Sequence, residues 1–169
     1  FFLLSWPLGL SAVFGVIFIS ADSVIMGYFE QITETGWYGA SRRVIGAIVM
    51  PATFVFISLY PFFSRLFKES KEKLQKAWNY YMELMIILAF PIMAGGLFFA
   101  PKIINLAFGS DFFQSILAFQ ILIFIAGINF LYSPYVLILI VSGNQKKYLW
   151  INLIGAIVSI VLNFILISR

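Results

Sequence analysis

Two adjacent arginines, Arg42 and Arg43, interrupt a stretch of sequence that is otherwise apolar enough for the interior of a lipid bilayer. A charge inside a membrane costs free energy, so an ionisable residue there is by default a candidate functional residue. The guanidinium group presents its N–H donors as a planar fork, which suits the oxygens of a phosphate. We therefore consider this arginine pair a candidate binding site for an anionic ligand.

Asp22 offers the arginines a partner of opposite charge. If one apolar stretch ends near Phe29 and the next begins near Trp37, Asp22 lies ~10 Å inside its helix and the arginines lie ~8–9 Å inside theirs. One interpretation is a structural ion pair between Asp22 and one arginine. Because consecutive helical residues point about 100° apart, one carboxylate cannot serve both. The other arginine either reaches outward to lipid headgroups or faces a cavity and binds an anion.

Small residues surround the arginines, and small side chains let helices approach closely. These small residues predict a packed interface or a cavity at this depth. They are Gly36, Gly39, Ala40, Gly46 and Ala47.

Polar residues also occur in the later apolar stretches. Most intramembrane amides form hydrogen bonds between helices, which is the first interpretation for Gln120, Ser133, Asn152 and Asn163. For Asn129 and Tyr132 a position lining a cavity is the alternative, and we include both among the candidate substrate-binding residues. Five prolines in or at the ends of these stretches indicate either kinked packing or hinges, and they are Pro51, Pro61, Pro91, Pro101 and Pro134.

Composition places all of these residues in a membrane protein. The 169 residues are 62% hydrophobic and only 11% charged, whereas soluble domains are about 25% charged. The absence of Cys and His excludes disulfides, catalytic cysteine or histidine, and zinc sites built from those ligands. We expect no cofactor, no metal and no nucleic-acid partner. The net charge of +4 is better explained by an unequal distribution of basic residues between the loops than by affinity for nucleic acid.

Five apolar segments are each long enough to cross ~30 Å of hydrocarbon. They predict an all-α membrane protein with five transmembrane helices forming a single bundle over residues 1–169. The predicted spans are residues 6–29, 37–67, 78–108, 114–141 and 148–167. The chain starts and stops beside apolar runs, so we expect a segment of a longer protein.

Lysines set the predicted orientation. They are concentrated in the connections at residues 68–77 and 142–147, whereas Glu30, Glu34 and Asp111 lie in the opposite loops. The positive-inside rule therefore predicts that residues 68–77 and 142–147 are cytoplasmic. Three oppositely charged pairs four residues apart, Lys68–Glu72, Glu69–Lys73 and Glu72–Lys76, favour a helix at the cytoplasmic surface of the membrane. The preferred interpretation is a solvated connector, and contact with anionic lipid headgroups is the alternative.

Several short motifs, in this order and spacing, resemble the Wzx-type polysaccharide biosynthesis flippases of the multidrug/oligosaccharidyl-lipid/polysaccharide exporter superfamily. They are DSVIMGYF from Asp22, GWYGASR from Gly36, LYPFFSR from Leu59, FG at Phe108, SGNQK from Ser142 and LNFILI from Leu162. In that family the last motif usually continues Leu-Ile-Pro, whereas this chain has Ile167, Ser168 and Arg169.

The resemblance implies a two-bundle transporter in which this chain supplies roughly spans seven to eleven, most of the second bundle. It implies a non-enzymatic protein of the inner membrane that turns a polyprenyl-pyrophosphate-linked oligosaccharide, such as an O-antigen or capsule unit, to the outer leaflet. Arg42 matches the arginine after the family's Tyr-Gly-Ala motif, whose tyrosine is Tyr38, and Arg43 is an addition. The resemblance implies that Tyr38, Arg42 and Arg43 bind the substrate, and it favours Arg42 as the arginine that faces the cavity. The implied partners are membrane lipids, the remaining helices of the transporter and a polysaccharide polymerase.

Three alternatives remain open. A multidrug or cation antiporter would need an acidic cation site, and only Asp22 lies in mid-membrane. A lipid II flippase is a closer relative of the preferred function. A non-transporting scaffold, or the membrane domain of a glycan-polymerising enzyme, belongs to another class. An enzyme would need a polar catalytic loop on the outer side, where the loops here are short.

Overall fold

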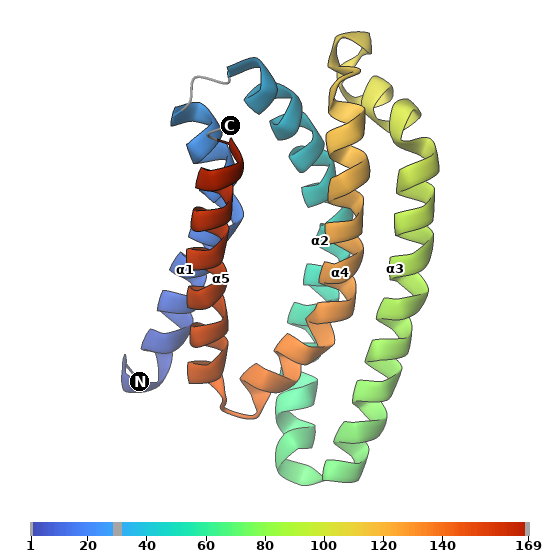
Figure 1. Ribbon diagram of the computed structural model, residues 1–169. Coiled ribbons are helices and arrows are strands. Elements are labelled where there is room, and N and C mark those ends of the chain that lie inside the picture. The colour runs from blue at the N-terminus through green and yellow to red at the C-terminus, as the bar shows by residue number, and fades with distance from the viewer. Residues whose placement is uncertain (1, 29–31, 168–169) are drawn as a thin grey trace. The chain divides into compact units, whose positions relative to one another are not determined.

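The computed structural model describes residues 2–28 and 32–167, and helix is the regular secondary structure throughout them (Figure 1). The prediction of an all-helical protein is confirmed for these residues. The predicted end of the first span at Phe29, together with Glu30, Ser168 and Arg169, lies outside the described residues. The helices are α1 (Phe2–Tyr28), α2 (Ile32–Glu69), α3 (Lys71–Phe108), the short 3-10 helix η1 (Ser110–Phe112), α4 (Ser115–Val141) and α5 (Gln145–Ile167).

Helix length and apolar character identify a multi-pass membrane protein. Among the described residues, four helices, α2 to α5, are long and apolar enough to cross a bilayer. α1 is a fifth if its two halves, Gly9–Phe18 and Ser20–Tyr28, form one span despite a bend of 47° between them.

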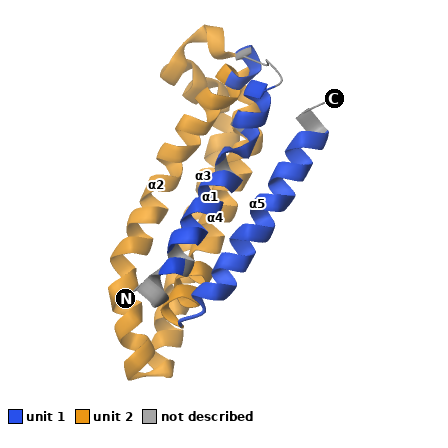
Figure 2. Ribbon diagram, turned by 90° about the vertical axis from the view of Figure 1, so that its left-hand side faces the viewer, with its two compact units in different colours: residues 1–35, 143–169 blue, residues 36–142 orange. Residues whose placement is uncertain are grey.

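The chain divides into two compact units (Figure 2). Unit 1 comprises residues 1–35 and 143–169, and it contains α1 and α5. Unit 2 comprises residues 36–142, and it contains most of α2 together with α3, η1 and α4.

In unit 1, α1 and α5 lie side by side and run in the same direction, as expected for the first and last of five alternating spans (Figure 1). Their contact uses small residues. Gly155 on α5 leaves room for the Phe18 ring, which would lie 3.6 Å from a Cβ at that position. The Ser159 hydroxyl donates a hydrogen bond of 3.4 Å to the Phe18 carbonyl.

In unit 2, α3 and α4 form the closest helix pair. A methyl group added at Gly96 on α3 would overlap the side chain of Ile123 on α4. One added at Gly127 on α4 would overlap Met93 on α3. The two glycines therefore allow each helix to receive a side chain of the other, which is a common way of packing helices in membranes.

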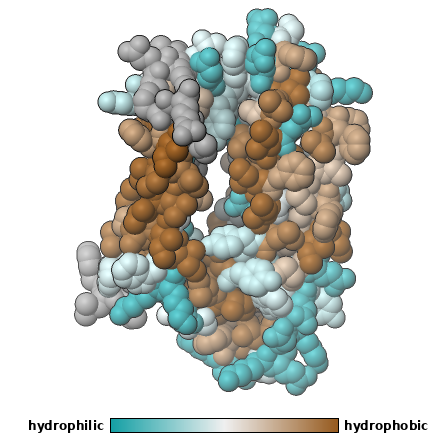
Figure 3. All heavy atoms as spheres, in the orientation of Figure 1, coloured by the Kyte–Doolittle hydropathy of each residue, from teal (hydrophilic) through white to brown (hydrophobic). Residues whose placement is uncertain are grey.

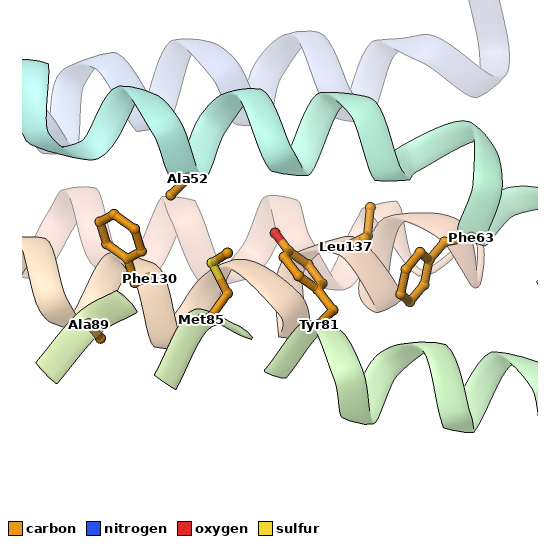
Figure 4. Packing of buried hydrophobic residues seen from close by; sticks show 7 residues of the cluster. All are labelled: Ala52, Phe63, Tyr81, Met85, Ala89, Phe130 and Leu137. Carbon is orange, nitrogen blue, oxygen red and sulfur yellow. The ribbon is translucent and has the colours of Figure 1, made fainter. Parts of the chain in front are cut away.

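α2 joins this pair through larger side chains. Figure 4 shows seven buried residues of one cluster, contributed by all three helices: Ala52 and Phe63 from α2, Tyr81, Met85 and Ala89 from α3, and Phe130 and Leu137 from α4. Within it, the Tyr81 and Ser133 hydroxyls share a hydrogen bond of 2.6 Å, which joins α3 to α4.

The ends of the helices follow from local sequence. Ser70 separates α2 from α3 in extended conformation, and its hydroxyl accepts a hydrogen bond from the Lys73 backbone N–H, as an N-cap does. Gly109 ends α3 with φ at +86°, a value that favours glycine.

The connector predicted over residues 68–77 is not a separate element. α2 continues to Glu69 and α3 begins at Lys71, so this hydrophilic segment forms the ends of two long helices (Figure 3). Of the three predicted ion pairs in the segment, Glu72 to Lys76 is present at 2.8 Å. The other two would span the break at Ser70, where the helical spacing of four residues is lost.

The prolines lie inside continuous helices. Pro51 and Pro61 lie within α2, Pro91 and Pro101 within α3, and Pro134 within α4. None of them ends a helix, and their role as hinges remains a prediction.

Candidate functional site

A buried serine fixes how α2 presents its arginines. Ser41 is fully buried, and its hydroxyl donates a hydrogen bond of 2.7 Å to the carbonyl of Ser115 at the start of α4. Each further residue turns about 100° around the helix. Arg42 therefore lies on the flank of the packed face and is half-buried, while Arg43 lies on the side opposite Ser41 and is exposed within the chain.

Arg42 and Tyr38 form a cation–π contact. The guanidinium carbon lies 5.8 Å from the centre of the Tyr38 ring, which precedes it by one helical turn. Such contacts operate within about 6 Å of the ring centre. The structure therefore brings together two of the predicted site residues and restrains the Arg42 side chain.

Arg43 has a different environment. Among the described residues it has no hydrogen bond, ion pair or ring contact. Small residues, including Gly39 and Gly46, lie near it on α2. No atom lies within 4 Å of the position that a Cβ would take on Gly39 or Gly46. Of the predicted small residues, Ala40 is buried beside Ser41, whereas Gly39 and Gly46 have no close neighbour. Within unit 2, the glycines that other helices approach are Gly96 and Gly127.

Asn129 and Tyr132 lie far from the arginines along the bundle axis. Ser115 marks the level of the arginines, because it contacts Ser41. Asn129 follows Ser115 by about 14 helical residues, which places it ~21 Å deeper along α4. Both side chains are exposed, and Asn129 donates a hydrogen bond of 2.9 Å to the Ile125 carbonyl of its own helix. The predicted binding residues of unit 2 thus lie at two different depths along its helices.

The predicted ion pair between Asp22 and an arginine joins residues of different units. Asp22 is half-buried on α1 in unit 1, whereas both arginines belong to unit 2. The pair therefore remains a prediction.

The remaining polar residues of the spans act mainly within their own helices. Gln120 on α4 donates to the Leu97 carbonyl on α3 at 3.4 Å, which confirms its interhelical role. Asn152 and Asn163 instead donate to carbonyls four residues earlier, at 3.1 and 2.9 Å. Within the described residues, both asparagines bond only their own helix, so the expected interhelical bonds are not formed there.

Two polar features of the bundle could not be predicted from the sequence. One is the bond between Ser41 and Ser115, and Ser115 also has a buried hydroxyl for which the described part of the chain provides no partner. The other is the partner of Ser133, the buried hydroxyl of Tyr81. Serine and tyrosine are too common in such helices to attract notice. In the described part of the chain, no group of three or more acidic, His or Cys residues could hold a metal ion.

Comparison with known proteins identifies the family. A family model described as polysaccharide biosynthesis protein matches residues 1–117, more than half of the chain. The match includes Asp22, Tyr38 and both arginines, whereas Asn129 and Tyr132 lie beyond it. No curated protein and no solved structure gave a match. The chain therefore belongs to the polysaccharide biosynthesis protein family, and its resemblance to the Wzx-type flippases is confirmed.

Proposed function

We propose that this chain is part of a transporter that flips a polyprenyl-pyrophosphate-linked oligosaccharide from the inner to the outer leaflet of the cell membrane by alternating access. Family membership and the intramembrane arginines support this function. In the proposed architecture the chain supplies most of the second helix bundle, and the other helices of the transporter complete the cavity. A polysaccharide polymerase would use the flipped product.

The observation that carries the proposal is the position of Arg43. Its guanidinium is exposed within the chain and without a partner among the described residues, on the face of α2 opposite the packed face. A charge within a bilayer needs a counter-charge or water. A pyrophosphate provides both charge and oxygens in the geometry that a guanidinium binds best. We assign Arg43 to direct contact with the pyrophosphate.

Arg42 has a second role in this proposal. The Tyr38 ring restrains its guanidinium on the flank of α2, so less side-chain entropy is lost when it binds an anion. Arg42 and Tyr38 together would receive the phosphate from a second direction. Asp22 would hold an arginine in place or release it to the substrate during the transport cycle.

Asn129 and Tyr132 are assigned to the glycan. A lipid-linked oligosaccharide is long and carries hydroxyl groups at some distance from its pyrophosphate. The exposed amide of Asn129 and phenol of Tyr132, ~21 and ~26 Å along α4 from the arginine level, would provide hydrogen-bond partners for such hydroxyls at a second depth.

Export by single-residue variants tests the assignment. We expect Arg43→Ala, in the transporter containing this chain, to reduce surface glycan at least about tenfold at a normal membrane level, because hydrogen bonds to charged groups contribute ~1.5–3 kcal/mol. Arg43→Lys should restore only part of the export, since lysine cannot form a bidentate pair with phosphate. The measurement is surface glycan in a strain whose own flippase gene has been deleted.

Lys102→Ala is the matched control, because it removes an exposed positive charge from another helix of unit 2. It should leave export within about twofold of the parent, since no arginine contact depends on it. Unchanged surface glycan in both Arg42→Ala and Arg43→Ala would refute the proposed phosphate site. Loss of drug resistance with normal glycan would instead favour the multidrug antiporter.

A further inference from the structure

A groove lies between the C-terminal part of α2 and the N-terminal part of α3, at the opposite end of unit 2 from the arginines. Its volume is about 580 Å³, within the ~300–1,000 Å³ of typical ligand sites. α2 contributes apolar and aromatic side chains, and α3 contributes two lysines followed by apolar and aromatic ones. The lining residues are Leu59, Phe62, Phe63, Leu66, Lys73, Lys76, Ala77, Tyr80, Tyr81 and Leu84.

The groove changes in character along its length. Lys73 and Lys76 lie at the end nearest the break at Ser70, whereas Leu84 lies ~16 Å farther along α3. On α2, which runs in the opposite direction to α3, Leu59 lies at the same apolar end of the groove. A positively charged mouth therefore continues into an apolar channel, as the headgroup and the hydrocarbon chain of an anionic amphiphile require.

The floor of the groove is rigid and already formed. Phe63 and Tyr81 are 1% and 2% exposed, and their rings pack edge to face at 6.0 Å (Figure 4). The walls remain accessible, because Phe62 and Leu84 are each 42% exposed. A ligand could enter without displacing the core, which keeps the free-energy cost of reorganisation small.

The charges at the mouth are available to a ligand. Lys76 pairs with Glu72 at 2.8 Å, but both side chains are largely exposed, so this ion pair is weak. Lys73 has no ion pair or side-chain hydrogen bond among the described residues. Lysines beside a membrane attract acidic lipids electrostatically.

We propose that this groove binds an anionic glycerophospholipid of the leaflet next to the lysine-rich end, with its phosphate between Lys73 and Lys76 and one acyl chain along Phe62, Tyr80 and Leu84. By the positive-inside rule this leaflet is the cytoplasmic one. A covering helix would fill the apolar part but would leave Lys73, which has no ion pair among the described residues, without a counter-charge. A phospholipid supplies both the anionic headgroup and the acyl chain. Its binding does not depend on the identity of the transported substrate.

Photo-crosslinking in lipid nanodiscs tests the proposal. The transporter is reconstituted in phosphatidylcholine containing a small fraction of phosphatidylglycerol with a photoactivatable acyl chain, and labelled peptides are mapped by mass spectrometry. We expect labels on the segments around Phe62 and Leu84. The double variant Lys73→Gln/Lys76→Gln should reduce them about five- to twentyfold, because each lysine near an anionic lipid contributes a factor of about five.

The matched control is Lys68→Gln/Lys71→Gln, which removes the same charge from the same segment but from residues outside the groove. It should retain labelling within about twofold. Leu84→Trp, which keeps the lysines and narrows the apolar end, should also reduce labelling. All of these positions are exposed, and a single symmetric peak in gel filtration would verify folding.

Four outcomes would overturn the proposal. Equal loss in the control variant would mean that only diffuse charge attracts the lipid. Equal competition by unlabelled phosphatidylcholine would exclude selection for an anionic headgroup. Displacement by undecaprenyl phosphate at lower concentration than by phosphatidylglycerol would make the carrier lipid the occupant. Absence of label in the groove would mean that protein covers it.

Discussion

The two helix interfaces of unit 2 are built differently. α3 and α4 approach through Gly96 and Gly127, each of which accepts a side chain from the other helix. α2 instead contacts them through large side chains such as Phe63 and through one buried hydrogen bond, from Ser41 to Ser115. In the most apolar stretch of α4, 44% of the residues are buried, whereas in the corresponding stretch of α2 only 6% are buried.

The difference concerns how tightly each helix is held within unit 2. Lipid chains are as apolar as the helices, so close packing and hydrogen bonds, rather than the hydrophobic effect, hold helices together in a membrane. The α3–α4 pair has the closer packing. α2, which carries both arginines, has fewer buried residues, and its position depends more on single contacts such as the bond from Ser41 to Ser115.

The largest expected effect comes from filling the α3–α4 interface. Gly96→Ala should destabilise the protein by about 1–3 kcal/mol, because the added methyl overlaps the buried, branched side chain of Ile123. Gly127→Ala should have a smaller effect, since flexible Met93 can move aside. Thermal unfolding in detergent measures both.

Gly95→Ala is the control for that substitution. Nothing lies within 4 Å of its added methyl group. It should leave stability unchanged or raise it by up to about 1 kcal/mol, because alanine favours a helix more than glycine does. Equal destabilisation by Gly95→Ala and Gly96→Ala would show that the α3–α4 contact is not the tight one.

An intermediate effect is expected from the hydrogen bond within the core. Tyr81→Phe should cost about 1 kcal/mol, since it deletes the hydroxyl that bonds Ser133 and leaves the half-buried serine without this partner. Tyr80→Phe makes the same chemical change at the next residue, which is 74% exposed, and should be neutral. If both variants unfold at the parent temperature, the bond does not stabilise the bundle.

The smallest effect on stability is expected at α2. Ser41→Ala should cost only about 0.6 kcal/mol, a typical value for a hydrogen bond between membrane helices. Ser58→Ala, on an exposed position of the same helix, is the control. Because Ser41 fixes the rotation of α2, export should fall more than stability does. A stability loss above that of Gly96→Ala would contradict the proposed order of the two interfaces.

Some of these features were predictable and others were not. The five apolar segments and the oppositely charged residues four apart predicted helices, but Ser70 divides the charged segment between two helices and breaks two of the three expected ion pairs. The small residues around the arginines predicted a packed interface or a cavity, and Ala40 among them is buried, but the glycines in close contact with another helix are Gly96 and Gly127. A list of glycines does not give the rotation of a helix against its neighbours.

The sequence by itself determined the membrane class, the helical fold and the family, because these depend on composition, segment length and motif order. Only the tertiary structure showed that Arg42 is half-buried beside the packed face of α2, whereas Arg43 lies on the opposite side of α2 from Ser41 and is exposed. It also placed Asn129 and Tyr132 at a second level. The physical reason is that long-range contacts such as Ser41 to Ser115 set the rotation and register of each helix, and no local pattern encodes them.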